Sequence, residues 1–324
     1  TLGFVRHAIN VEQASYGFIA HKVFGPIMDP IMSARAATAE DRGVRDYPYV
    51  GFIAHRTEMK FASFSWRNKI MGMIIPIGEG HEGNPDFTVP IQDGFVGSFE
   101  VDPAGDIKED KKITVVERDL KRTDDGFETA GTLLLHSGRL QQKIKMTSIG
   151  AQTVIYEDEV TALAGITVKK ELGIPFGIEN DEITGGARVV TSRDARTVVN
   201  WRDPKPPMAI QGRWINVDGR LGVVSIAGSG LSYAQGSGYL PGISVCADKL
   251  YGSYFDRPRQ FRAGDVVARR LAVFLVEVTP QRMSRLTESY RIDEQDGVQM
   301  LRFKQPDGKD CKVQIAFGRL SAGS

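Results

Sequence analysis

The sequence has almost no excess of charge of either sign. Its 324 residues include 41 lysines and arginines against 40 aspartates and glutamates, a formal net charge of +1. No global electrostatic field therefore draws the chain toward nucleic acid or an anionic membrane. It also lacks an apolar run near the roughly 20 residues that a membrane-spanning helix needs. The longest candidates, Ile70–Ile77 and Leu271–Val276, have the length of strands. We expect neither nucleic acid nor a membrane as a partner.

Cysteine is scarce as well. Only Cys246 and Cys311 occur, and two cysteines do not make a disulfide framework. Both lie in segments of alternating apolar residues, so we expect buried thiols, with a disulfide between them left open. The chain begins at Thr1 and no apolar stretch typical of a signal peptide follows. We expect either that a leader has been removed or that the chain is a fragment of a longer protein.

Several motifs of common catalytic, nucleotide and metal sites are absent. The sequence contains no Walker A segment, His-Glu-x-x-His, Gly-x-Ser-x-Gly or EF-hand loop. A glycine-rich stretch at 226–242 lacks the G-x-G-x-x-G spacing of dinucleotide-binding folds, and we expect no cofactor. The glycine loop 78–84 carries His81 between Glu79 and Glu82. Such spacings are common in glycine loops, and we predict no metal site.

Alternation of apolar and polar residues fills most of the chain between Phe61 and Phe317. In Leu140–Met146, for example, every second residue belongs to one face and lysine or glutamine occupies the other. Turn signals such as the Asp-Gly pair at 218–219 separate these segments and predict hairpins. The pattern predicts an all-β fold, a large antiparallel multi-sheet β-sandwich over residues 46–324.

The first 45 residues differ from the rest. Asn10 and Gln13 fit a capping box, and the Gly-Pro pair at 25–26 is a typical helix stop. We predict an amphipathic helix at Val11–Phe24, followed by a linker, so that residues 1–45 form a short N-terminal helical segment.

Candidate catalytic residues flank the predicted strand Lys60–Trp66. His55 titrates near neutral pH and can act as a general base, while Arg56 or Arg67 can bind a carboxylate through two hydrogen bonds. β-Elimination from a uronic acid needs both functions, a cation that neutralises the carboxylate and a base that removes the adjacent C–H proton. The alternative is that His55 is a hydrogen-bonded strand residue and Arg67 a solvated strand end.

Aromatic residues in the glycine-rich stretch extend this candidate site. Tyr233 and Tyr239 alternate with glycines there, and glycine lets a loop fold tightly while aromatic rings project from it. Such rings suit stacking on a sugar, and a tyrosine near His55 would protonate the leaving oxygen in an elimination. An ordinary loop at the edge of a sheet is the alternative.

The tryptophans lie beside arginines and amides, a combination that suits sugar recognition. In the predicted strand, Trp214 and Asn216 share one face, where they can stack on a sugar and hydrogen-bond to it. The alternative is that Trp214 anchors the core and Asp218 only shapes a turn. We expect the tryptophans to divide between core and cleft. The predicted substrate-binding residues are Trp66, Asn68, Trp201, Arg202, Trp214 and Asn216.

Two segments resemble a known family. The run Trp-Ile-Asn-Val-Asp-Gly-Arg-Leu-Gly-Val-Val at 214–224 and the strand Phe-Ser-Trp-Arg-Asn at 64–68 are similar to the large β-sandwich that follows the helical toroid in polysaccharide lyases of the hyaluronate, chondroitin, alginate and heparin-lyase type. The resemblance covers the character of residues 45–324. It implies a secreted or periplasmic protein that acts on an acidic polysaccharide by β-elimination.

The resemblance has one departure with a consequence for the site. In that family the toroid supplies much of the catalytic set, and this chain has no helical domain of that size. Catalytic residues are therefore not transferred one by one, and a separate helical domain or a second chain is an expected partner beside the polysaccharide. Two alternatives stay open. One is a non-catalytic carbohydrate-binding or structural module. The other is a glycoside hydrolase whose paired carboxylates come from Glu79, Glu82, Asp203 and Asp218.

Overall fold

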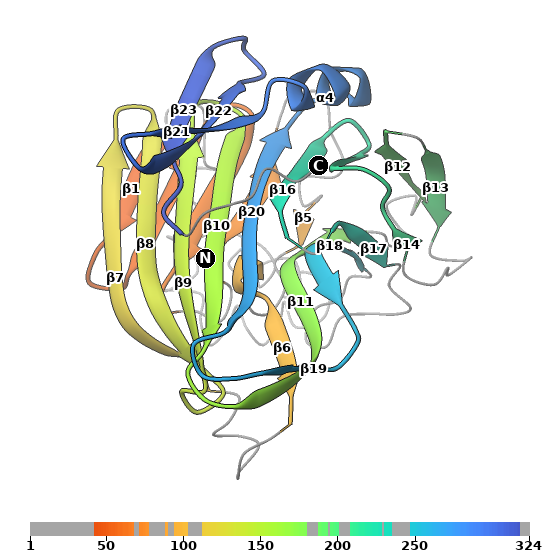
Figure 1. Ribbon diagram of the computed structural model, residues 1–324. Coiled ribbons are helices and arrows are strands. Elements are labelled where there is room, and N and C mark those ends of the chain that lie inside the picture. Colours follow the sequence, from red (N-terminus) through yellow and green to blue (C-terminus); the bar gives the residue numbers. More distant parts are fainter. Residues whose placement is uncertain are drawn as a thin grey trace, which may run out of the picture. The chain divides into compact units, whose positions relative to one another are not determined.

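The computed structural model describes residues 42–67, 71–77, 88–89, 94–102, 112–179, 187–193, 195–200, 208–228, 230–234 and 247–317. The helix predicted at Val11–Phe24 lies outside these ranges. Within them the chain is almost entirely antiparallel strand, as the alternation predicts (Figure 1). None of the helices in these ranges has the length and apolar character that crossing a membrane requires.

A nine-stranded antiparallel sheet forms the centre of the fold. The Asp-Gly turn predicted within it is present. Asp218 and Gly219 have φ of 53° and 72°, and Arg220 N donates to Val217 O at 2.9 Å. In order of pairing, the strands are β13 (Arg196–Asn200), β12 (Ala187–Ser192), β15 (Trp214–Val217), β16 (Leu221–Ala227), β20 (Val266–Val276), β10 (Thr153–Ala162), β9 (Leu140–Ile149), β8 (Gly126–Leu135) and β7 (Thr114–Thr123).

A seven-stranded sheet packs on one face of the nine-stranded sheet. Between the two lies an aromatic core, in which Phe95 is stacked on Phe274 at 5.1 Å between ring centroids and lies 4.9 Å from Phe176. This packing confirms the predicted stacking of sheets. The strands are β14 (Met208–Ala209), β17 (Ser232–Ala234), β18 (Ala247–Phe255), β11 (Ile166–Glu179) and β19 (Arg259–Phe261), with β5 (Thr88–Val89) and β6 (Ser98–Val101) also paired to β11.

A four-stranded sheet near the beginning of the described chain extends the same core. Phe64 and Trp66 are buried in one cluster with Phe127 of β8. Lys60 joins this sheet to the β9–β10 turn, because its buried ammonium donates to three backbone carbonyls there, at 2.6 to 2.8 Å. The strands pair in chain order, β1 (Gly43–Tyr47), β2 (Phe52–Arg56), β3 (Lys60–Ser65) and β4 (Met73–Pro76).

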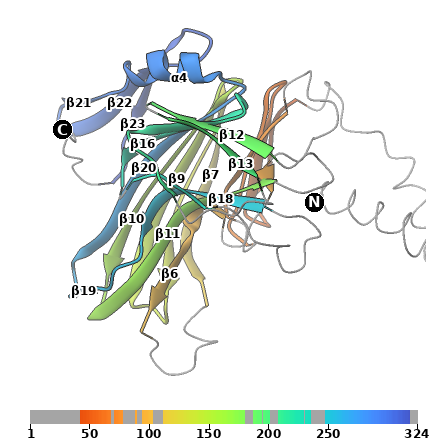
Figure 2. The ribbon, with the colours of Figure 1, turned by 90° about the vertical axis from the view of Figure 1, so that its right-hand side faces the viewer.

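Part of the opposite face of the nine-stranded sheet is covered by a three-stranded meander, β21 (Arg291–Gln295), β22 (Val298–Lys304) and β23 (Asp310–Gln314), and by the helix α4 (Pro280–Thr287) (Figure 2). A second apolar cluster lies beneath them, where Met283 of α4 packs with Trp214 and Leu301. The sequence analysis missed α4. Its signal is the pair Thr279-Pro280, an N-cap threonine whose side chain accepts from the backbone of Arg282, followed by proline at the first helical position.

Candidate functional site

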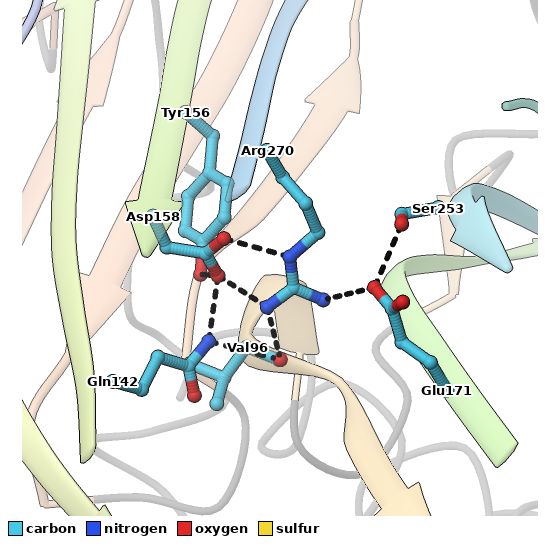
Figure 3. Close-up of polar contacts among 7 residues, drawn as sticks. All are labelled: Val96, Gln142, Tyr156, Asp158, Glu171, Ser253 and Arg270. Carbon is cyan, nitrogen blue, oxygen red and sulfur yellow. Dashed lines mark hydrogen bonds and ion pairs between the residues drawn. The ribbon is translucent and has the colours of Figure 1, made fainter. Parts of the chain in front are cut away.

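A buried network of charged side chains joins the two large sheets (Figure 3). Arg270 of β20 donates from Nε to Asp158 Oδ1 of β10 at 2.7 Å and from Nη2 to the other carboxylate oxygen. Its Nη1 lies 3.4 Å from Glu171 Oε1 of β11, and Ser253 Oγ of β18 donates to that oxygen at 2.7 Å. The side chains of Arg270 and Asp158 are 0% exposed. The network therefore ties four strands of two sheets together.

The remaining contacts satisfy the carboxylate of Asp158. Tyr156 Oη and Gln142 Nε2 donate to its Oδ2 at 2.9 and 2.6 Å. Burial raises the pKa of Glu171, and the neighbouring charge of Arg270 opposes that rise. Because none of these groups faces solvent, we interpret the network as a clamp between the sheets and not as a ligand site. The sequence signal for it is a carboxylate, Asp158, on the face of the strand that otherwise carries apolar and aromatic residues.

The backbone beside this network is strained. Ile174 on β11 is β-branched and fully buried, yet its φ is 49°, in the left-handed region. Next to it, Gly173 leaves the space that the guanidinium of Arg270 fills, since a Cβ there would overlap Nη1. Replacing Gly173 would therefore displace the arginine that the clamp depends on.

His55 is enclosed in the four-stranded sheet. It is 6% exposed, and its Nδ1 lies 3.1 Å from Ser148 Oγ. Burial, and secondarily the charge of Lys60, lowers the pKa of His55 to about 4, so the imidazole is neutral at pH 7. The strand register pairs His55 with Ala62 of β3, and Arg67 lies five residues further along the chain, two residues past the end of that strand, on the order of 16 Å away for an extended chain. The structure keeps His55 beside Arg56, which is half-buried, and apart from Arg67.

Tyr233 is buried in the seven-stranded sheet, and its Oη donates to Asp248 Oδ2 at 2.7 Å. Burial, and next the charge of Asp248, raises the pKa of Tyr233 well above its ordinary value. His55 belongs to the four-stranded sheet instead. Among the described residues, no hydrogen bond joins the side chains of Tyr233 and His55. Tyr239 lies outside those residues. The described part of the chain thus leaves the proposed grouping of histidine, arginine and tyrosine unassembled.

Trp66 and Trp214 are core residues. Trp66 is 1% exposed and donates from Nε1 to Thr129 Oγ1 at 2.7 Å, while Trp214 is 6% exposed beneath α4. Asn216 is buried, and it donates to Val278 O at 2.6 Å and accepts from Gly219 N at 2.8 Å. For Trp214 the structure matches the alternative of a core anchor. The other predicted substrate-binding residues, Asn68, Trp201 and Arg202, lie outside the described residues.

Of the four carboxylates considered for hydrolysis, Asp218 is the one that lies in the described residues. One of its oxygens accepts from Val189 N at 2.6 Å, and the other lies 3.2 Å from Arg188 Nη1. These contacts hold Asp218 in the turn between β15 and β16, a turn-shaping role. Glu79, Glu82 and Asp203 lie outside the described residues, as does His81.

An exposed aromatic and cationic surface lies at the turn between β1 and β2. Tyr47 and Tyr49 are 54% and 84% exposed, and the guanidinium carbon of Arg67 lies 5.4 Å from the centroid of the Tyr49 ring. We call these three residues the Tyr49–Arg67 surface. Arg67 was expected to bind an anion, whereas the sequence analysis missed the two tyrosines. Their signal is the sequence Tyr-Pro-Tyr in a turn, where alternation gives no buried face.

The backbone beneath this surface is anchored. Arg118 of β7 donates from Nη2 to Pro48 O and Tyr49 O, at 3.4 Å each. Gly51, with φ of 66°, closes the turn, and a side chain there would overlap the guanidinium of Arg118. Trp66 N donates to Gly51 O at 2.8 Å, which connects the turn to the buried end of β3. The exposed rings are therefore presented by a fixed turn.

Metal-ligating and thiol groups are sparse in the described residues. In these ranges no group of three or more histidine, cysteine, aspartate or glutamate side chains is placed to hold a metal ion. Cys311 is a partly buried free thiol, and burial raises its pKa to about 11. Cys246 lies outside the described residues.

Comparison with known proteins gives only a loose resemblance of folds. No family model matches the chain, and none of the curated proteins matches it in sequence. Similar solved structures include heparan sulfate lyase HepC from Pedobacter heparinus, at 12% identity and a TM-score of 0.46 over 91% of this chain and 46% of that one. An alpha-galactosidase from Lactobacillus brevis matches at 9% identity and a TM-score of 0.46, over 75% of this chain and 40% of that one.

The galactosidase domain of alpha-galactosidase-sucrose kinase matches at 10% identity and a TM-score of 0.42, over 72% of this chain and 41% of that one. The chain therefore spans less than half the length of each of these proteins. Both lyases and galactosidases occur among the similar structures, so the likeness does not distinguish elimination from hydrolysis.

Proposed function

We propose that this chain is a carbohydrate-active protein that binds an acidic polysaccharide through the Tyr49–Arg67 surface. The observation that supports the proposal is the guanidinium of Arg67 over a tyrosine ring that is 84% exposed. An exposed aromatic plane suits the C–H face of a sugar, and a guanidinium suits a carboxylate or sulfate through paired hydrogen bonds. The two groups together favour an anionic sugar chain over a neutral one.

Arg67 is the cation of this surface that is open to a ligand. In the described ranges no carboxylate pairs with Arg67, whereas Arg122 is paired with Asp46 and Arg118 donates to the turn carbonyls. A carboxylate bound by Arg67 would lie within reach of the Tyr49 ring. Affinity should therefore depend on both residues and should weaken as salt screens the charge.

Affinity measurements with a panel of polysaccharides test the proposal. Tyr49→Ala and Arg67→Gln should each raise Kd for a uronate-containing polysaccharide by roughly tenfold, the effect of about 1.4 kcal/mol. The salt dependence of binding should be smaller in Arg67→Gln than in the parent protein. Arg302→Gln is the control, since it removes another exposed arginine, 50% exposed and paired with Asp293 on β21. Parent-like affinity in both Tyr49→Ala and Arg67→Gln would reject the surface.

We propose β-elimination as the reaction of any enzyme to which this chain belongs. Arg67 has the chemistry to neutralise a uronate carboxylate, which is what makes the adjacent proton removable. His55 is enclosed, and its pKa of about 4 makes it a weak base, so the base for that proton would come from another group. Absorbance of unsaturated uronate after incubation with the same panel distinguishes a lyase from a binding module, and release of reducing sugar without that absorbance would indicate hydrolysis.

A further inference from the structure

The chain after β23 crosses the outer face of the nine-stranded sheet in a short segment, residues 315–317, which we call the C-terminal strap. Ile315 N still donates to Gln299 O at 2.9 Å, so the strap begins as a continuation of the meander. At Ala316 the pairing changes, and its N–H donates to a side chain of the sheet, Glu157 Oε2 of β10, at 2.8 Å. The strap is therefore held by a carboxylate where the strand ladder ends.

Glu157 is buried beneath this strap. It is 3% exposed, although it lies on the face of the sheet that would be open to solvent without the meander and strap. Lys145 of β9 is opposite Glu157 in the strand register, donates to Gln314 O at 3.2 Å and pairs with Glu128 of β8 at 3.0 Å. Glu159, the next residue of β10 on the same face, pairs with Arg269. The strap itself, Ile-Ala-Phe, contributes no titratable side chain.

These contacts connect docking of the strap to proton binding. Burial raises the pKa of Glu157 from 4.5 to about 7, against the backbone donors of the strap and the charge of Lys145, while Glu128 adds to the rise. A carboxyl group whose pKa rises on burial takes up a proton when it is covered. Docking is then strongest below the ordinary pKa and weakens as the pH rises from about 4.5 to about 7.

We propose that the C-terminal strap is a pH-dependent latch, which is held on β10 in acid and loosens toward neutral pH. The carboxylate of Glu157 is the sensor, and the apolar strap is what moves. Loosening exposes Glu157, which the docked strap contacts through Ala316, on the outer face of the sheet. The latch is independent of the Tyr49–Arg67 surface, so failure of either proposal leaves the other standing.

Hydrogen exchange at single amides tests the latch. Protection factors of the Ala316 and Phe317 amides, corrected for intrinsic exchange, should fall at least about tenfold between pH 5 and 7.5. The ceiling is about 60-fold, if the strap supplies all of the burial of Glu157. Glu157→Gln keeps an acceptor oxygen but does not titrate, so its protection factors should stay level over this range. Glu159→Gln, on the same strand and face, is the matched control and should keep the parent slope.

A second variant keeps the test decisive if Glu157→Gln does not fold. Lys145→Met removes the charge that opposes the rise in pKa of Glu157, so the fall in protection should move to higher pH. Level protection factors in the parent protein would overturn the proposal. So would a parent-like slope in Glu157→Gln, or an unmoved midpoint in Lys145→Met.

Discussion

Replacing Arg270 by methionine tests whether the buried clamp stabilises the sandwich as its geometry implies. Methionine fills much of the arginine volume but leaves Asp158 and Glu171 buried without their cation. Removing one partner of a buried ion pair costs about 3–5 kcal/mol in proteins, because the remaining charge is uncompensated.

The structure puts the expected loss at the lower end of this range. Glu171, whose pKa is already raised by burial, can become neutral by binding a proton. Asp158 keeps two donors, Tyr156 Oη and Gln142 Nε2. We therefore expect Arg270→Met to lower the free energy of unfolding by about 3 kcal/mol at pH 7. The loss should shrink as the pH falls, because protonation removes the uncompensated charges.

Urea denaturation with and without the substitution measures this loss. Arg302→Met is the matched control, because it breaks an ion pair whose partners are 50% and 42% exposed and should cost less than about 1 kcal/mol. The double variant Arg270→Met, Glu171→Gln should recover part of the loss, because one of the two stranded charges is gone. If Arg270→Met costs no more than Arg302→Met, the clamp does not stabilise the fold and the reasoning fails.

Two further predictions concern residues that the sequence analysis assigned to the site. Trp214→Ala should lower the free energy of unfolding by about 3–5 kcal/mol in urea denaturation, because Trp214 is 6% exposed under α4; nearly unchanged stability would contradict its place in the core. An NMR titration should give His55 a midpoint near 4, below the ordinary 6.5, with stability lost as the pH falls through this interval and that part of the loss absent in His55→Gln. A midpoint near 6.5 would show that His55 is accessible to solvent and available as a base.

Local sequence determined the strands and many of their turns. The alternation at Leu140–Met146 became part of β9, and that at Lys60–Trp66 became β3, which ends one residue earlier, at Ser65. The Asp-Gly pair at 218–219 forms the predicted turn, because both residues tolerate a left-handed backbone. These features depend on residues near one another in the chain, so a single sequence contains them. The helix α4 was missed because its eight residues carry little beyond the Thr279-Pro280 start signal.

Only the tertiary structure decided which faces are buried and which side chains meet. Alternation marks two faces of a strand, but the nine-stranded sheet is buried on parts of both faces, on one beneath the seven-stranded sheet and on the other beneath α4 and the meander. For that reason Trp214, which suited a sugar site by its neighbours, lies in a core. Arg270 meets Asp158 and Glu171 across separations of 112 and 99 residues, which no local pattern specifies. Tyr49 stays exposed because its turn projects beyond the strands, where neither covering layer buries it.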